Sequence, residues 1–137
     1  MTENTIYMVV NAPKIHQRII GQLMMRLGIL YYLEKAIPFE PLPETMIDEC
    51  QTSPTPDILL FDNENKLNRV IIEISGNTGA RRDFEKIKNL MIDYNVAEGF
   101  VYNYDTKQWR KYLLDQGEDL LRPSFCEAIG YDLNALI

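Results

Sequence analysis

The stretch that decides the fold is DILLFDNENKLNRVIIEIS, residues 57–75. It contains two apolar runs, Asp57–Phe61 and Arg69–Ile74, which are rich in Ile, Leu, Phe and Val. The polar segment 62–66 between them predicts a hairpin loop. Both runs are apolar on both faces, which is typical of central strands that helices cover. We therefore expect this hairpin to lie at the centre of the domain.

Helices and further strands are expected on either side of the hairpin. Apolar residues recur every four positions over Ile15–Leu33, and a second helix is predicted over Ala80–Tyr94 after the break at residues 76–79. This order predicts a mixed α/β (α+β) fold, a single domain over residues 1–137 with a central mixed sheet flanked by helices. The other expected elements are strands at Ile6–Asn11, Ala36–Leu42, around Met46 and Ile47, Gly99–Tyr104 and Trp109–Leu114, and a short final helix capped by Asp132.

Composition excludes several classes of protein. Of 137 residues, 46% are hydrophobic and 25% charged, which excludes intrinsic disorder and low-complexity sequence. The apolar stretches are too short to cross a bilayer, and the first residues lack the pattern of a secretory signal, so a cytoplasmic location without membrane contact is expected. Two cysteines, Cys50 and Cys126, cannot form a disulfide framework or a zinc site and are expected as reduced thiols.

The chain carries 14 Lys and Arg against 20 Asp and Glu, a net charge of −6. Such a chain has no global attraction for phosphate backbones. Binding to nucleic acid therefore requires a local basic patch or a bridging metal ion. The single histidine, His16, is expected to have a structural or capping role.

Each central strand carries one carboxylate beside buried apolar residues. Asp57 begins the first strand and Glu73 lies near the end of its antiparallel partner, so the two side chains are expected to converge at one end of the sheet. Two carboxylates with a backbone carbonyl between them suit Mg²⁺, which prefers hard oxygen ligands. Two structural alternatives remain open: Asp57 as a turn residue after Pro56, and Glu73 in an ion pair with Arg81.

These residues resemble a known pattern. Pro56-Asp57 followed by Glu73-Ile74-Ser75 is similar to the motif of the PD-(D/E)XK nuclease superfamily, and the chain most resembles its Uma-two-like family of restriction endonucleases. The resemblance covers nearly the whole chain, and the N-terminal extension usual in that family is not expected here. Its remaining segments are Asn11-Ala12-Pro13 with His16-Gln17-Arg18-Ile19, Thr78 with Arg81-Arg82-Asp83, Val96-Ala97-Glu98, and Pro123-Ser124 through Asp132-Leu133.

The resemblance implies a restriction-endonuclease-like core and hydrolysis of DNA phosphodiester bonds with Mg²⁺ or Mn²⁺. Asp57, Glu73 and the Ile74 carbonyl would hold the metal, which lowers the pKa of an attacking water. A lysine would orient that water and offset negative charge. The chain departs from the motif here, because Ser75 occupies the usual lysine position and Ile87 the position where this family carries it in the following helix.

Lys86 and Lys88 flank Ile87 and are the candidates for the missing lysine. If Phe84, Ile87, Met91 and Tyr94 form the buried stripe, Lys88 lies at its edge and Lys86 points nearly away, which favours Lys88. The cations of this segment, Arg81, Arg82, Lys86 and Lys88, exceed its two acids by two, and we expect Arg81, Arg82 and Lys88 to contact DNA.

Two functions thus remain in competition. The first is a metal-dependent endonuclease, plausible as a homodimer because cutting both strands often needs two sites. The second is an interaction domain that has kept the nuclease fold and lost its activity. The acidic net charge and the displaced lysine favour the second, and the Asp57–Glu73 pair favours the first.

Overall fold

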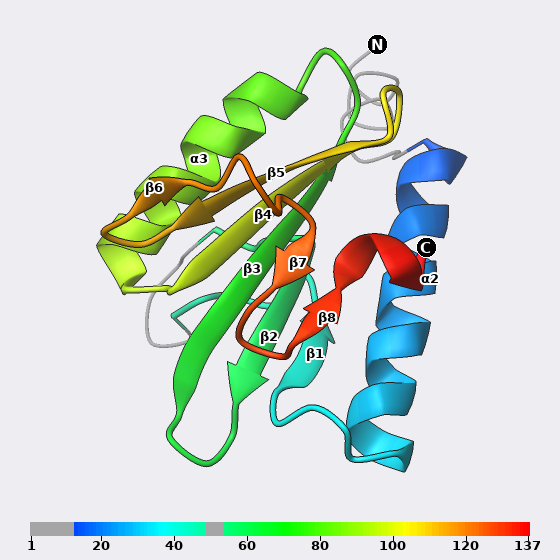
Figure 1. The fold of residues 1–137 in the computed structure, drawn as a ribbon, viewed down its shortest axis with the longest axis vertical. Helices are drawn as coiled ribbons and strands as arrows, with labels where there is room; N and C mark the ends of the chain where they lie inside the picture. The colour runs from blue at the N-terminus through cyan, green and yellow to red at the C-terminus, as the bar shows by residue number, and fades with distance from the viewer. Residues whose placement is uncertain (1–12, 49–53) are drawn as a thin grey trace, which may run out of the picture.

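The computed structural model describes residues 13–48 and 54–137, so the expected strand Ile6–Asn11 lies outside the described residues (Figure 1). The elements follow one another in the order α2 (Lys14–Gly28), the π-helical turn η1 (Ile29–Leu33), β1 (Glu40–Pro43), β2 (Ile58–Asp62), β3 (Leu67–Ser75), α3 (Ala80–Tyr94), β4 (Glu98–Asn103), β5 (Gln108–Leu113), β6 (Gly117–Glu118), β7 (Phe125–Cys126), β8 (Tyr131–Asp132) and the 3₁₀ helix η2 (Leu133–Leu136).

A six-stranded sheet with the order β1-β2-β3-β4-β5-β6 forms the centre of the molecule. β3 and β4 pair in parallel, and the other neighbours are antiparallel. Helix α3 covers one face, whereas α2 and the C-terminal segment cover the other (Figure 1). The prediction of a mixed α/β fold with a central sheet between helices is confirmed.

Alternation along β3 divides the core into two layers. Val70, Ile72 and Ile74 pack in the layer of α2, whereas Ile71 packs in the layer of α3. On the α3 side, helix and sheet approach closely at Gly99, because a Cβ there would lie 2.5 Å from the Met91 sulfur. By the same alternation Glu73 lies on the α3 face, and this position becomes important for the site.

Three predictions about local structure can be compared directly with the structure. Asp132 does cap the last helix, since its carboxylate accepts the Asn134 N–H at 3.0 Å. The first helix reaches Leu33 as expected, but its last turn is π-helical. The prediction of a strand around Met46 and Ile47 is wrong, because these residues form no ladder with a neighbouring strand. Ile47 is instead buried in the α3 layer, and its carbonyl accepts a hydrogen bond from the side-chain amide of Asn68. Among the described residues, no helix is long and apolar enough to span a membrane.

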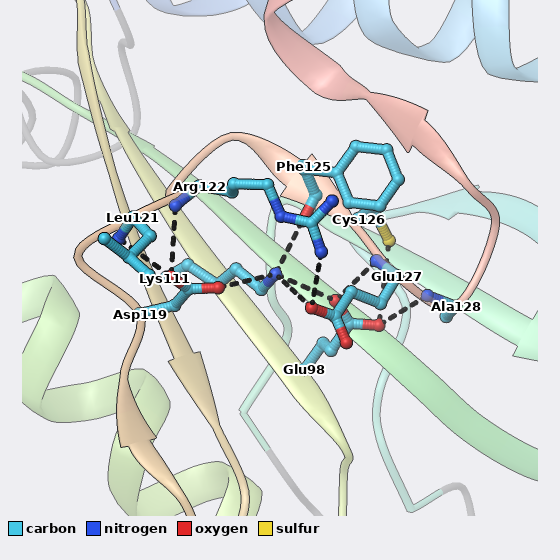
Figure 2. A network of polar contacts seen from close by, with 9 residues as sticks. All are labelled: Glu98, Lys111, Asp119, Leu121, Arg122, Phe125, Cys126, Glu127 and Ala128. Atoms are coloured by element: carbon cyan, nitrogen blue, oxygen red, sulfur yellow. Dashed lines mark hydrogen bonds and ion pairs between the residues drawn. The ribbon is translucent and has the colours of Figure 1, made fainter.

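A buried lysine fastens the C-terminal segment to the sheet (Figure 2). The Lys111 side chain is 0% exposed, and its ammonium donates to the Phe125 carbonyl at 2.7 Å. The same ammonium lies 3.3 Å from Asp119, 3.5 Å from Glu127 and 3.8 Å from Glu98. Glu98 in turn accepts the backbone N–H groups of Glu127 and Ala128 at 2.9 and 2.6 Å. Because every charge here has partners, we interpret the cluster as structural.

Replacing Lys111 tests this interpretation. Lys111→Met keeps the aliphatic volume but leaves the buried Glu98 without its cation, so the free energy of unfolding should fall by about 3–5 kcal/mol in a urea titration. Adding Glu98→Gln should recover part of that loss, because a neutral amide needs no counterion. The control is Lys107→Met, at an exposed turn residue. A Lys111→Met variant as stable as that control would contradict the structural role.

Candidate functional site

The site lies at the edge of the sheet where β3 and β4 end and β2 begins. Ile58 pairs with Ile72, so the antiparallel register continued by one residue places Asp57 opposite Glu73. The convergence expected from the sequence is therefore what the fold produces. We call this cluster, defined by Asp57, Glu73, Asp83 and Lys86, the acidic rim.

Asp57 is oriented by two contacts from other elements. Its Oδ2 accepts the Ile74 N–H at 2.8 Å and lies 3.3 Å from His16 Nε2, on the first turn of α2. The alternative role of Asp57 as a turn residue that bonds within its own loop does not account for these contacts. They connect the carboxylate to β3 and α2.

Glu73 is the buried member of the acidic rim. Only 7% of its side chain is exposed, and its Oε1 lies 3.3 Å from Lys86 Nζ. Burial, reinforced by the charges of Asp57 and Asp83, raises the pKa of Glu73 to about 8, although Lys86 acts in the opposite direction. The ion pair with Arg81 that the sequence left open is thus replaced by one with Lys86.

Helix α3 contributes both Asp83 and Lys86 to the rim. The Ser75 hydroxyl donates to Asp83 Oδ2, which fixes the first turn of the helix to the end of β3. Lys86 reaches Glu73 while 41% of its side chain remains exposed to solvent. Ser75, which occupies the usual lysine position of the motif, therefore positions an acid of the helix instead.

The expectation that Lys88, rather than Lys86, lies on the helix edge that reaches the carboxylates is wrong. Its ammonium lies 2.9 Å from Glu85 and 5.6 Å from the ring centres of both Phe84 and Tyr112, on the side of β5. Leu90 is also buried, which widens the apolar stripe toward Lys86. The two lysines consequently flank the stripe on opposite edges, and only the edge of Lys86 faces β3.

The expected basic patch is partly neutralised within the chain. Arg82, whose side chain is 78% exposed, lies 3.8 Å from Asp83, while Lys86 and Lys88 are paired with Glu73 and Glu85. Arg81 lies exposed on the same turn of α3. The segment keeps exposed arginines near the rim, but much of its positive charge serves its own acids.

The rim gathers three carboxylates: Glu73 is paired with Lys86, Asp83 lies 3.8 Å from Arg82, and Asp57 lies 3.3 Å from His16, which is charged only when protonated. Hard oxygen donors of this kind suit a divalent cation. In residues 13–48 and 54–137, no group of three or more His, Cys, Asp or Glu side chains is arranged to hold a metal ion. A cation at this site would therefore use Asp57 and Glu73 with a main-chain oxygen and water.

The Ile74 carbonyl fits the role of that main-chain oxygen. The β2–β3 pairing begins at Ile58 and Ile72, and Pro56 lies two residues before it. Proline has no N–H group, so it cannot donate to this carbonyl as a strand residue would. The Pro-Asp pair thus interrupts the ladder and supplies a carboxylate at the same point.

Two members of this neighbourhood, His16 and Asp83, lie in segments of the family resemblance but were not expected at the site itself. Asp83 had a usable signal, because it lies three residues before Lys86 and so on the same helix face. His16 had none, since only the packing of α2 against the sheet brings it to Asp57.

Two other features do not belong to the rim. A hollow of about 400 Å³, lined in part by Asn68, Glu98 and Leu113, lies at the opposite end of the sheet. Burial raises the pKa of Cys126 to about 12, so this thiol is protonated and is no nucleophile.

Comparison with known proteins adds no identification: no protein-family model matches the chain, and no curated protein matches it.

The raised pKa of Glu73 predicts how stability depends on pH in metal-free protein. The folded state holds this proton up to about pH 8 and the unfolded state releases it near 4.5, so the contribution of Glu73 to stability is full below about 4.5 and is lost as the pH rises through 8. Glu73→Gln does not titrate. Relative to wild type its stability should rise steadily from about pH 5 to about pH 8 and change no further above that.

Urea unfolding in the presence of EDTA at several pH values measures this difference. Glu64→Gln, in the exposed β2–β3 turn, is the control and should stay parallel to wild type. If Glu73→Gln also stays parallel, Glu73 is ionised throughout and the assigned protonation is wrong.

Proposed function

We propose that this chain is a metal-dependent nuclease domain that hydrolyses DNA phosphodiester bonds with Mg²⁺ or Mn²⁺. The observation that carries the proposal is the buried Glu73 carboxylate, opposite Asp57 and 3.3 Å from the Lys86 ammonium at one edge of the sheet. The resemblance to the PD-(D/E)XK pattern concerns the same two acids. A buried, strongly perturbed acid beside a second charge is a usual mark of a functional site.

Asp57, Glu73 and the Ile74 carbonyl are the proposed metal ligands. Asp57 is already oriented by the Ile74 N–H and by His16, so it loses little freedom on binding. Glu73 is ionised only at a cost in the metal-free protein, and a divalent cation would remove that cost. When bound, the cation polarises the phosphate and lowers the pKa of an attacking water.

Lys86 takes the role that the motif assigns to its lysine. Its ammonium is held at the rim by Glu73, yet two fifths of the side chain is exposed and can meet a substrate. From this place it can orient a water molecule and offset the charge that develops on the phosphate. Lys88, held by Glu85, has no such position.

Recognition of DNA would depend on the metal more than on the field of the protein. The net charge of −6 repels a phosphate backbone at long range. The exposed Arg81 and Arg82 and the N-terminal amides of α3 lie next to the rim and offer local attraction. Binding should therefore need the divalent cation, and two exposed arginines predict only a shallow salt dependence, with a slope of log K against log salt of about −2.

Metal binding can be measured without activity. Mg²⁺ or Mn²⁺ should raise the melting temperature of wild type, by the equivalent of about 3 kcal/mol at a concentration a hundred times the Kd. Asp57→Asn and Glu73→Gln should abolish the rise, because each removes a charged ligand. Asp105→Asn, at the neighbouring β4–β5 turn, is the control and should keep it. Equal shifts in all four proteins would place the ion elsewhere.

Cleavage separates the two lysines. Lys86→Met should reduce nicking of a supercoiled plasmid by roughly 10²–10³-fold, because one charge-stabilising donor is lost. Lys88→Met should cut at close to the wild-type rate. Equal loss in both would remove Lys86 from its proposed role. Metal binding without cleavage of any DNA form would instead support the interaction domain.

A further inference from the structure

The exposed side of α2 carries the polar residues Lys14, Gln17, Arg18 and Arg26, but its second half also exposes apolar side chains. Its inner face buries Ile19, Ile20, Leu23 and Leu27 against the sheet. On the opposite face, Met25 is 57% exposed, Ile29 38% and Leu33 76%. An amphipathic helix that covers a sheet normally carries polar residues there. Met25 and Ile29 are four residues apart and neighbours on the α-helical surface, and Leu33 follows at the end of the π-helical turn η1; we call these three residues the apolar ridge.

A gap precedes this ridge at Gly21. The residue is exposed, its φ is not positive, and a Cβ there would meet no atom within 4 Å. Glycine within a helix costs about 1 kcal/mol relative to alanine, and among the described residues no neighbour requires it. One turn before Met25, the helix surface is therefore open to the close approach of another body.

The ridge and the gap are complementary to each other. Gly21 and Ile29 each lie four residues from Met25, on either side. If two α2 helices meet antiparallel with Met25 at a two-fold axis, Ile29 of each lies over Gly21 of the other. The side chain then fills the gap, as ridges fill grooves between packed helices.

Charges support the same arrangement. Position 34 is nine residues after Met25, so its counterpart across the axis is position 16. Glu34 of one copy would thus lie between Lys14 and Arg18 of the other. Antiparallel helices also bring opposite ends of their dipoles together.

We propose that the outer face of α2 binds a second copy of this chain, through an antiparallel pair of α2 helices with Ile29 of each seated over Gly21 of the other. The interface lies on the side of α2 away from the sheet. It stands on its own observations and does not depend on the proposed nuclease function.

Oligomeric state, measured by sedimentation equilibrium on the full chain, tests the proposal. Wild type should be a dimer at micromolar concentration. Gly21→Gln should weaken the dimer at least about tenfold while making the isolated helix more stable, because it fills the gap and improves helix propensity. Ile29→Glu should be monomeric. The control is Ile92→Glu, an exposed isoleucine on α3 that should leave the dimer intact.

A charge exchange tests the antiparallel pairing itself. Arg18→Glu and Glu34→Arg should each weaken the dimer, and the double variant should restore it, because both charges belong to every copy. A monomeric wild type overturns the proposal. Dimerisation that occurs only after residues 1–12 are removed also overturns it, because those residues would then compete with the second copy for the outer face of α2. A dimer unaffected by Gly21→Gln and Ile29→Glu also overturns it.

Discussion

The cost of burying the Glu73 carboxylate beside Asp57 is the constraint around which the acidic rim is built. β3 places Glu73 in the layer of α3, where only 7% of its side chain reaches solvent. The nearest cation, Lys86, does not offset the burial and the two neighbouring acids, so the pKa of Glu73 rises to about 8. The geometry that brings these groups together is the β2–β3 register, which depends on the hairpin and on the apolar packing of both faces.

A second buried glutamate in the same sheet shows what a purely structural solution looks like. Glu98 is as deeply buried, and its pKa is also raised by burial. It accepts two backbone N–H groups and faces the fully buried Lys111, so its partners are those of a closed network (Figure 2). Glu73 has one partially exposed lysine and two acids nearby. The contrast is between a carboxylate that the fold pairs with a fully buried cation and one whose nearest lysine is partly exposed to solvent.

The central hairpin, both long helices and the convergence of Asp57 and Glu73 could be predicted, because periodicity and a short hairpin loop are local signals. Which of the two lysines reaches the carboxylates could not be predicted. The choice depends on which edge of α3 faces β3, and that is set by the β3–α3–β4 crossover and by Leu90, not by the spacing of charges alone. The contacts of His16 with Asp57 and of Lys111 with Glu98 are likewise tertiary. They join segments that no pattern in the sequence connects.

The most direct test of this account is the anomalous scattering of Mn²⁺ in crystals of the wild-type protein. The account predicts one strong peak at the acidic rim, roughly 2.0–2.3 Å from oxygens of Asp57, Glu73 and the Ile74 carbonyl. It also predicts that the Lys86 ammonium stays at the same edge, within reach of a metal-bound water. Saturating Mn²⁺ with no peak between Asp57 and Glu73, or with Glu73 still bound to Lys86 alone, would contradict it.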